Sequence, residues 1–154
     1  MGEEKTTDAL GNILKKTKPE DISEFFKSHE ASMISSENAF ADFMRKTIKS
    51  KDLTQQEVFI AADFSEKYGY KLISGEKHTK QRDYILRLCF AGHFTLAETQ
   101  KALQLYNMAP LYAKIPRDAL LMSAFNSKTY NIFKINELLQ NNNFEELSNA
   151  SEID

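Results

Sequence analysis

Apolar residues recur at three- and four-residue steps along most of this chain, whereas the strict alternation typical of strands is scarce. These stripes predict helices over residues 22–29, 40–49, 54–62, 65–74, 84–90 and 97–105, and two more that carry residues 120–125 and 132–139. Only five glycines and three prolines occur among the 154 residues. The pattern therefore predicts an all-α fold.

Helix boundaries are marked by residues suited to capping. Thr54-Gln55-Gln56-Glu57 and Thr95-Leu96-Ala97-Glu98 are capping boxes, in which a threonine and a glutamate satisfy each other's free backbone amides. Asp63-Phe64-Ser65 predicts a tight turn, with a left-handed aspartate and with a serine that caps the next helix. Gly75 is a stop signal for that helix. Two short helices are therefore expected on either side of a brief turn.

The N-terminal region gives weaker signals. Residues up to about 16 are polar and predict a mobile lead. Thr17-Lys18-Pro19-Glu20 then combines a cap, an early-turn proline and an acid, which predicts a helix over Ile22–His29. Ser35-Ser36-Glu37 is expected to cap the helix that begins near Phe40.

A faint internal similarity links the later helices. With one residue inserted, Leu86, Phe90, Leu96, Gln100 and Leu103 align with Leu121, Phe125, Ile132, Asn136 and Leu139. Both segments are predicted to be helical hairpins. A repeat and the general rules of helix packing are both adequate explanations.

Residues 53–75 resemble the helix-turn-helix of the Cro/repressor-type, or XRE-type, family of DNA-binding regulators. The match needs no gap and rests on Leu53-Thr54-Gln55-Gln56-Glu57-Val58, Ser65, Leu72 and Ser74-Gly75. The family's basic loop corresponds to Lys77, His78 and Lys80. The resemblance covers about residues 38–102, and residues 96–139 are also similar to the C-terminal extension of a bacterial subgroup.

The resemblance implies a five-helix, lambda-repressor-like helix-turn-helix domain that is extended by a C-terminal helical hairpin, with a short helix at the N-terminus. The corresponding divisions are a polar N-terminal segment with that short helix (1–34), the DNA-binding domain (35–107), a helical extension packed on it (108–148) and a disordered tail (149–154). Asn141–Asn143 and the acidic tail are expected to fray. The hairpin either completes the core or forms a dimer surface. We favour a core position for its large apolar residues, Leu111, Tyr112, Leu120, Phe125, Ile132 and Phe133.

Three residues depart from the family pattern. Phe59 stands where the family usually has alanine, and Gly69 where a buried aliphatic residue is expected. The phenyl ring is expected to fill the space of the missing side chain, because cores tolerate volume-conserving exchanges. Asp63 replaces the glycine of the turn. Tyr68 and Tyr70 are each predicted either to face the groove or to pack under Phe59.

The resemblance also implies how the protein acts. The second helix of the motif would lie in the major groove of double-stranded DNA, while the preceding helix crosses the backbone. The implied DNA-binding residues, from the phosphate-facing helix start, the recognition helix and the basic loop, are Gln55, Ser65, Glu66, Lys67, Tyr70, Lys71, Lys77 and Lys80. The expected function is that of a sequence-specific transcriptional regulator, and a homodimer would supply two half-sites.

Charge leaves an alternative open. The net charge is −2 and the pI about 6.0, which by themselves do not favour nucleic acid. Residues 67–87, however, are locally basic. The alternative is a protein-interaction module or adaptor that reuses the fold for a protein partner without binding DNA. Lysines paired with Glu66 or Glu76 would favour that alternative.

Other functional classes have little support. The lone Cys89 and the scattered His29, His78 and His93 offer no metal-ligand spacing, and no nucleophile motif or phosphate loop is present, so neither an enzyme nor a cofactor is expected. Cys89 is expected to be a small buried core residue. No apolar run approaches the length of a membrane span and no secretory leader is evident, which predicts a cytoplasmic protein.

Overall fold

The computed structural model describes residues 6–29 and 38–150. Within these residues every regular element is a helix and no strand is present, so the predicted all-α class is confirmed. The expected cap at Ser35-Ser36-Glu37 lies outside the described residues. No helix in the described ranges has both the length and the apolar character needed to cross a bilayer.

Contacts divide the chain into two compact units, residues 1–35 and 36–154. The first contains α1 (Thr7–Leu14), a 3₁₀ turn (Pro19–Asp21) and α2 (Ile22–Ser28). The second helix was predicted, whereas α1 was not and lies in the segment that had been predicted to be a mobile lead. Thr6 caps α1 by accepting a hydrogen bond from the Ala9 amide at 3.1 Å, and Asp8 lies in its first turn.

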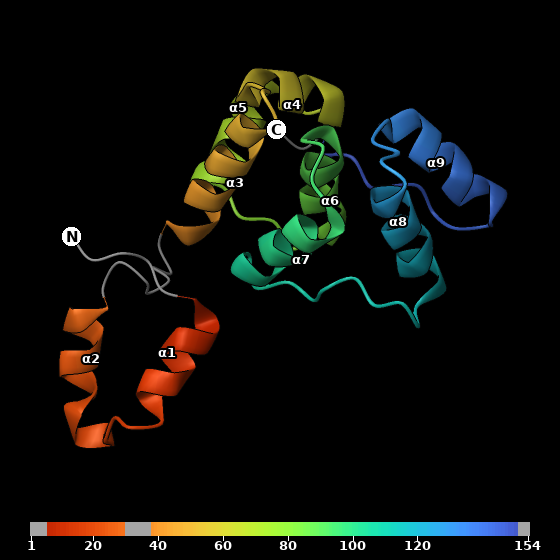
Figure 1. Ribbon diagram of the computed structural model, residues 1–154. Helices are drawn as coiled ribbons and strands as arrows, with labels where there is room; N and C mark the ends of the chain where they lie inside the picture. The colour runs from red at the N-terminus through yellow and green to blue at the C-terminus, as the bar shows by residue number, and fades with distance from the viewer. Residues whose placement is uncertain (1–5, 30–37, 151–154) are drawn as a thin grey trace. The chain divides into compact units, whose positions relative to one another are not determined.

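The second unit contains α3 (Ala39–Ser50), α4 (Gln55–Ala62), α5 (Glu66–Ser74), α6 (Arg82–Ala91), α7 (Leu96–Leu105), α8 (Pro116–Asn126) and α9 (Ile132–Asn141). Figure 1 shows α4 across the ends of its neighbours, and α4 contacts α3, α5 and α6. α6 and α7 lie centrally, with the hairpin of α8 and α9 beside them. The core includes Met44, Phe59, Leu72 and Phe90, which are fully buried.

The predicted caps and stop signals of α4, α5 and α7 are confirmed, whereas the cap predicted at Thr17 was wrong, because its hydroxyl donates back to the carbonyl of Ile13 at 2.9 Å. Thr54 and Glu57 form a complete capping box, as do Thr95 and Glu98. Asp63 adopts the left-handed conformation, with φ of 61°, and Gly75 ends α5 with φ of 88°. α4 and α5 are thereby separated by a turn of only three residues, 63–65.

The hairpins α6–α7 and α8–α9 follow one structural plan. Each has an Arg-Asp pair in its first turn, and each carries left-handed residues at matching places, His93 and Asn107 in the first and Lys128 and Asn143 in the second. Gln100 exchanges two hydrogen bonds with the backbone of Leu111, at 2.9 and 2.8 Å. Asn136 accepts one at 2.9 Å from the amide of Leu147, also eleven residues ahead. The sequence similarity therefore marks matching structure.

The contacts between the two hairpins are reciprocal. Arg82 pairs with Asp118 at 3.1 Å, and Arg117 pairs with Asp83 at 3.0 Å. The matching residues Phe90 and Phe125 stack on each other, with ring centroids 3.8 Å apart. These pairings, which join corresponding residues in both directions, are those of an approximate two-fold arrangement within one chain.

The end of the chain is anchored as far as residue 150, so the predicted disordered tail was wrong for its first two residues. Leu147 and Ala150 are buried. Arg87 donates hydrogen bonds to the carbonyls of Ser148, Leu147 and Ala62 at 2.6, 2.7 and 3.1 Å. A buried guanidinium needs such acceptors, and the acidic composition of the tail gave no indication of them. Residues 151–154 lie outside the described residues.

The core prediction for the C-terminal hairpin holds for most of its apolar residues. Leu111, Phe125 and Ile132 are buried and Leu120 is partly buried against the core. It was wrong for Tyr112, which is 53% exposed, and for Phe133, which is 90% exposed. The helical stripe alone did not reveal which side of α9 would find a neighbour.

Candidate nucleic-acid interface

α5 has one buried and one solvent-facing side. Tyr68, Gly69, Leu72 and Ile73 are buried. The opposite side carries Glu66, Lys67 and Tyr70, which are exposed, and Lys71, which is half-buried. This division follows from helical periodicity. The predicted base-reading residues of α5 therefore share one accessible face.

Ser65 sets the start of α5. Its Oγ accepts a hydrogen bond from the amide of Tyr68 at 3.1 Å, so its first role is to cap the helix. The side chain is exposed. Its hydroxyl proton therefore remains available to an external acceptor.

Phe59 and Gly69 are matched across the contact between α4 and α5. A Cβ placed on Gly69 would meet three ring carbons of Phe59 at 2.4–2.7 Å. The ring thus occupies the place of the missing side chain, and the predicted compensation is confirmed. Of the two tyrosines whose positions were left open, Tyr68 is buried against Phe64 and Tyr84, whereas Tyr70 stays 42% exposed with its ring against the edge of Phe59.

A groove of about 440 Å³ lies beside this face. Its wall includes Arg45 and Lys49 from α3, Gln55 and Gln56 from the start of α4, and Tyr70 from α5. Arg45 and Lys49 are exposed and one helical turn apart. Two cations are thereby held beside the first turn of α4, where the helix dipole also favours an anion.

Hydrogen-bonding capacity remains unused at this helix start. The capping box engages the amides of Thr54 and Glu57. Among the described residues, the backbone amides of Gln55 and Gln56 have no acceptor. The side-chain oxygen Oε1 of Gln55 is buried without a hydrogen-bond partner. Such groups call for an external partner, either water or a ligand.

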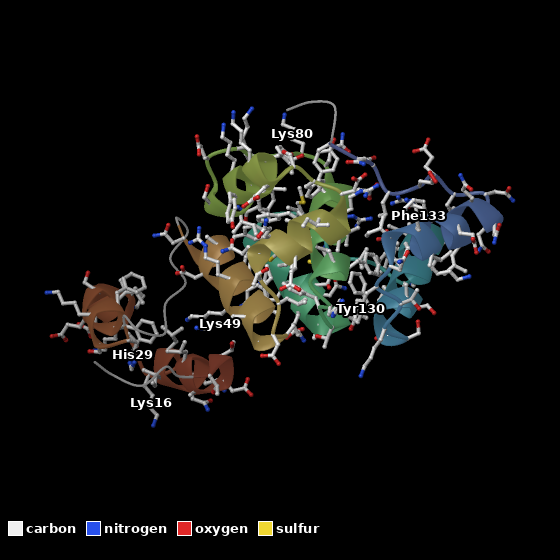
Figure 2. All side chains as sticks on the ribbon, turned by 90° about the horizontal axis from the view of Figure 1, so that it is seen from above. Lys16, His29, Lys49, Lys80, Tyr130 and Phe133 are labelled. Carbon is white, nitrogen blue, oxygen red and sulfur yellow. The ribbon has the colours of Figure 1, made fainter. Side chains whose placement is uncertain are left out.

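The segment after α5 is held in place by α7. The amide of Thr79 donates to the hydroxyl of Tyr106 at 2.9 Å, and the ring of His78 stacks on that tyrosine at 4.5 Å. Lys77 and Lys80 are exposed on either side of this anchor, and the backbone amide of Lys77 bonds to the carbonyl of Lys71 at 3.0 Å. Figure 2 shows Lys80 directed away from the ribbon. The loop lysines are therefore carried by an anchored segment.

The charged side chains of α5 form no ion pair within the described part of the chain. In residues 6–29 and 38–150, the ion pairs join Lys51 to Glu98, Arg82 to Asp118, Arg117 to Asp83 and Lys134 to Glu137. Lys67, Lys71 and Lys80 are in none of them, and neither are Glu66 and Glu76. The pairing that would have favoured an interaction module is thus absent from the described part of the chain.

The comparisons with known proteins add no assignment. No protein-family model, curated protein or solved structure matches this chain. Within the described residues, no group of three or more histidines, cysteines and carboxylates is placed to hold a metal. Cys89 is a buried core residue, as predicted, and burial raises the pKa of its thiol well above the ordinary range.

The sequence-based prediction missed Arg45 and Lys49. α3 had been interpreted only through its apolar face, on which Met44 and Ile48 are buried. The signal was present one position further along, since Arg45 and Lys49 repeat the same four-residue step on the outer side. Only the tertiary packing of α3 beside α4 and α5 shows that this outer side borders the groove.

Proposed function

We propose that this protein is a DNA-binding regulator of the Cro/repressor type. In this proposal α4 and α5 are the two helices of a helix-turn-helix in a lambda-repressor-like domain, and α5 enters the major groove of duplex DNA. The short turn at residues 63–65, the serine cap and the glycine stop are in keeping with that motif.

One observation carries the proposal. The outer face of α5 presents Lys67 and Lys71 without neutralising carboxylates in the described residues, although Glu66 and Glu76 are near in sequence. An ordinary solvent-facing helix of mixed charge tends to pair such groups along its surface. A cationic helix face without neutralising carboxylates suits the major groove of DNA, which is negatively charged because of the flanking phosphates.

The residues have distinct roles in this proposal. Glu66, Lys67, Tyr70 and Lys71 read base edges, for which lysine suits guanine O6 and N7 and a carboxylate suits cytosine N4. Lys77 and Lys80 neutralise phosphates that flank the groove. A further phosphate lies at the start of α4. It is held by the free backbone amides of Gln55 and Gln56, by the side-chain Nε2 group of Gln55, which donates, and by the two α3 cations, Arg45 and Lys49.

The test is a salt series of fluorescence anisotropy with random-sequence duplex DNA and with DNA from upstream of the protein's own gene. The salt range should span about 50–200 mM. Lys67→Ala and Lys71→Ala should each weaken binding by about 1–3 kcal/mol, and Arg45→Ala should reduce the salt slope by about one unit. Lys114→Ala is the matched control, because Lys114 is exposed on the α7–α8 connection.

Two results would count against the proposal. A folded wild-type chain that shows no salt-dependent binding would contradict it and favour the interaction-module alternative. Equal losses from Lys67→Ala, Lys71→Ala and Lys114→Ala would indicate unspecific attraction to positive charge, and would remove α5 from its assigned role.

A further inference from the structure

The most exposed large apolar side chains of residues 38–150 lie together on α4 and α9, away from the groove described above. Phe133 is 90% exposed and Ile60 is 71% exposed. Both border a hollow of about 890 Å³ between α4, α9 and the C-terminal segment. Phe133 also borders a second hollow, of about 290 Å³, with Tyr130 and His93. Phe133 therefore forms a ridge between two hollows. We call this surface, which comprises Phe133, Ile60 and the two hollows, the α4–α9 face.

The internal repeat shows that the fold does not require Phe133. Its counterpart in the first hairpin is Ala97, since both residues lie two positions after the helix caps Thr95 and Asn131. Glu137 likewise corresponds to Lys101, because the two follow the matching residues Asn136 and Gln100. The same hairpin thus forms without an aromatic ridge or an acidic residue at these places. A single exposed apolar residue is ordinary, but Phe133 and Ile60 border the same hollow, and exposed apolar residues grouped in this way mark an interaction surface.

Charge is segregated along this face. Lys134 lies beside Phe133 in the first turn of α9, whereas three carboxylates border the larger hollow, namely Glu137 of α9, Glu146 of the C-terminal segment and Asp63 of the turn after α4. Arg87 also borders the hollow, but three backbone carbonyls engage its guanidinium. The ion pair of Lys134 with Glu137 is 3.1 Å long and largely exposed, so exchanging it for a contact with another chain costs little.

We propose that the α4–α9 face is a homodimer interface, in which two copies of α9 pair in antiparallel fashion about a two-fold axis. An isologous interface must be complementary to itself. Here the ridge and its hollows lie side by side, so each Phe133 enters a hollow of the other copy. The antiparallel pairing brings the basic start of each α9 against the acidic side of the larger hollow in the other copy.

The contact surface between the two hairpins is not available to a second copy. The side of α6 and α7 that meets α8 and α9 is closed by the reciprocal pairs of Arg82 with Asp118 and Arg117 with Asp83 and by the stacked phenylalanines. A second copy could not use that side without breaking buried contacts. The resemblance already implied a homodimer, and this inference adds which face forms it, by residues that are separate from the DNA surface of α5.

The test is sedimentation equilibrium of the full chain over a wide concentration range. Phe133→Ala is the main variant because Ala97 shows that the hairpin folds with alanine there. It should raise the dimer dissociation constant about thirtyfold or more, as loss of an aromatic hot spot does. Ile115→Asp is the control: Ile115 is 47% exposed but borders neither hollow, so the constant should not change.

Charge-reversal variants of α9 test the dimer interface independently. K134E and E137K should each weaken pairing with itself, whereas a mixture of the two variants should form heterodimers more tightly than either variant alone. A wild-type chain that remains monomeric, or a dimer unaffected by Phe133→Ala, would overturn the proposal. Salt-dependent DNA binding by such a monomer would leave the proposed function standing, and a dimer without DNA binding would support the interface alone.

Discussion

At the scale of single residues, the contact between Phe59 and Gly69 explains why α5 contains a glycine, a residue that lowers helix propensity. Glycine within a helix costs about 1 kcal/mol relative to alanine. Here the ring of Phe59 fills the space that any side chain at residue 69 would need, and it is itself fully buried. The absence of a Cβ is therefore a packing requirement of α5.

Gly69→Ala should accordingly destabilise the protein. The added Cβ would overlap the ring of Phe59, and overpacking of this kind costs about 1–3 kcal/mol, more than the gain in helix propensity. In the Phe59→Ala background the sign should reverse, because the methyl group then enters empty space. Urea unfolding followed by circular dichroism measures both effects. A Gly69→Ala variant that is stabilised while Phe59 is present would refute this account of the contact.

At the scale of elements, the caps were predictable because they depend on residues three positions apart. The capping box of Thr95 and Glu98 also receives a long-range partner, since Lys51 of the α3 C-cap pairs with Glu98 at 2.7 Å. Burial by itself raises the pKa of Glu98, but the hydrogen bonds from Lys51 and from the Thr95 amide outweigh it. The pKa of Glu98 therefore lies below its ordinary value of 4.5.

This lowered pKa makes stability depend on pH. Because the folded pKa of Glu98 is lower than the unfolded one, its stabilisation is present above pH 4.5 and is lost as the pH falls through the folded value. Glu98→Gln should thus destabilise the protein at neutral pH, with a deficit that shrinks in acid. Urea midpoints at several pH values measure this. In the Lys51→Met background the pH-dependent part should be smaller, and an unchanged difference would exclude Lys51 as its cause.

The helices that sequence reasoning missed or misjudged had weak local signals. α1 was overlooked because polar residues surround the short apolar set Leu10, Ile13 and Leu14, although Thr6 and Asp8 mark its start. Periodicity could not distinguish the exposed face of α9 from its buried face, since Ile132 and Phe133 are adjacent apolar residues of which the first is buried and the second is exposed. What decides between them is the position of α6, which contacts α9 through tertiary packing.

At the scale of the whole molecule, much of the architecture follows from contacts between residues far apart in sequence. The faint hairpin similarity became informative only when Arg82 with Asp118 and Arg117 with Asp83 were seen to form reciprocal pairs. The groove beside α5 also depends on tertiary packing. There α3 supplies two cations to the start of α4, for which the sequence analysis had named only Gln55. Neither arrangement has a local pattern that would have predicted it.

The anchored end of the chain connects distant parts of the second unit. Arg87 of α6 joins the last carbonyl of α4, that of Ala62, to the carbonyls of Leu147 and Ser148. Asn149 donates to Asp63, in the turn before α5, at 2.7 Å. Burial lowers the pKa of Arg87, against the attraction of carboxylates that include Asp63. The C-terminal segment thus contributes to holding the turn that positions α5.

A chain that ends at Glu146 should therefore lose more stability than the burial of Leu147 alone explains. It leaves the guanidinium of Arg87 with one of its three carbonyl partners, and a charge that stays buried without its partners costs about 3–5 kcal/mol. A second substitution, at Arg87, tests whether the unpartnered guanidinium causes this loss of stability. Arg87→Met should destabilise the full chain but stabilise the shortened one, because it removes the charge that has lost its partners. Thermal unfolding of the four chains measures the cycle, and an equal loss from Arg87→Met in both would mean that its bonds to the tail contribute nothing.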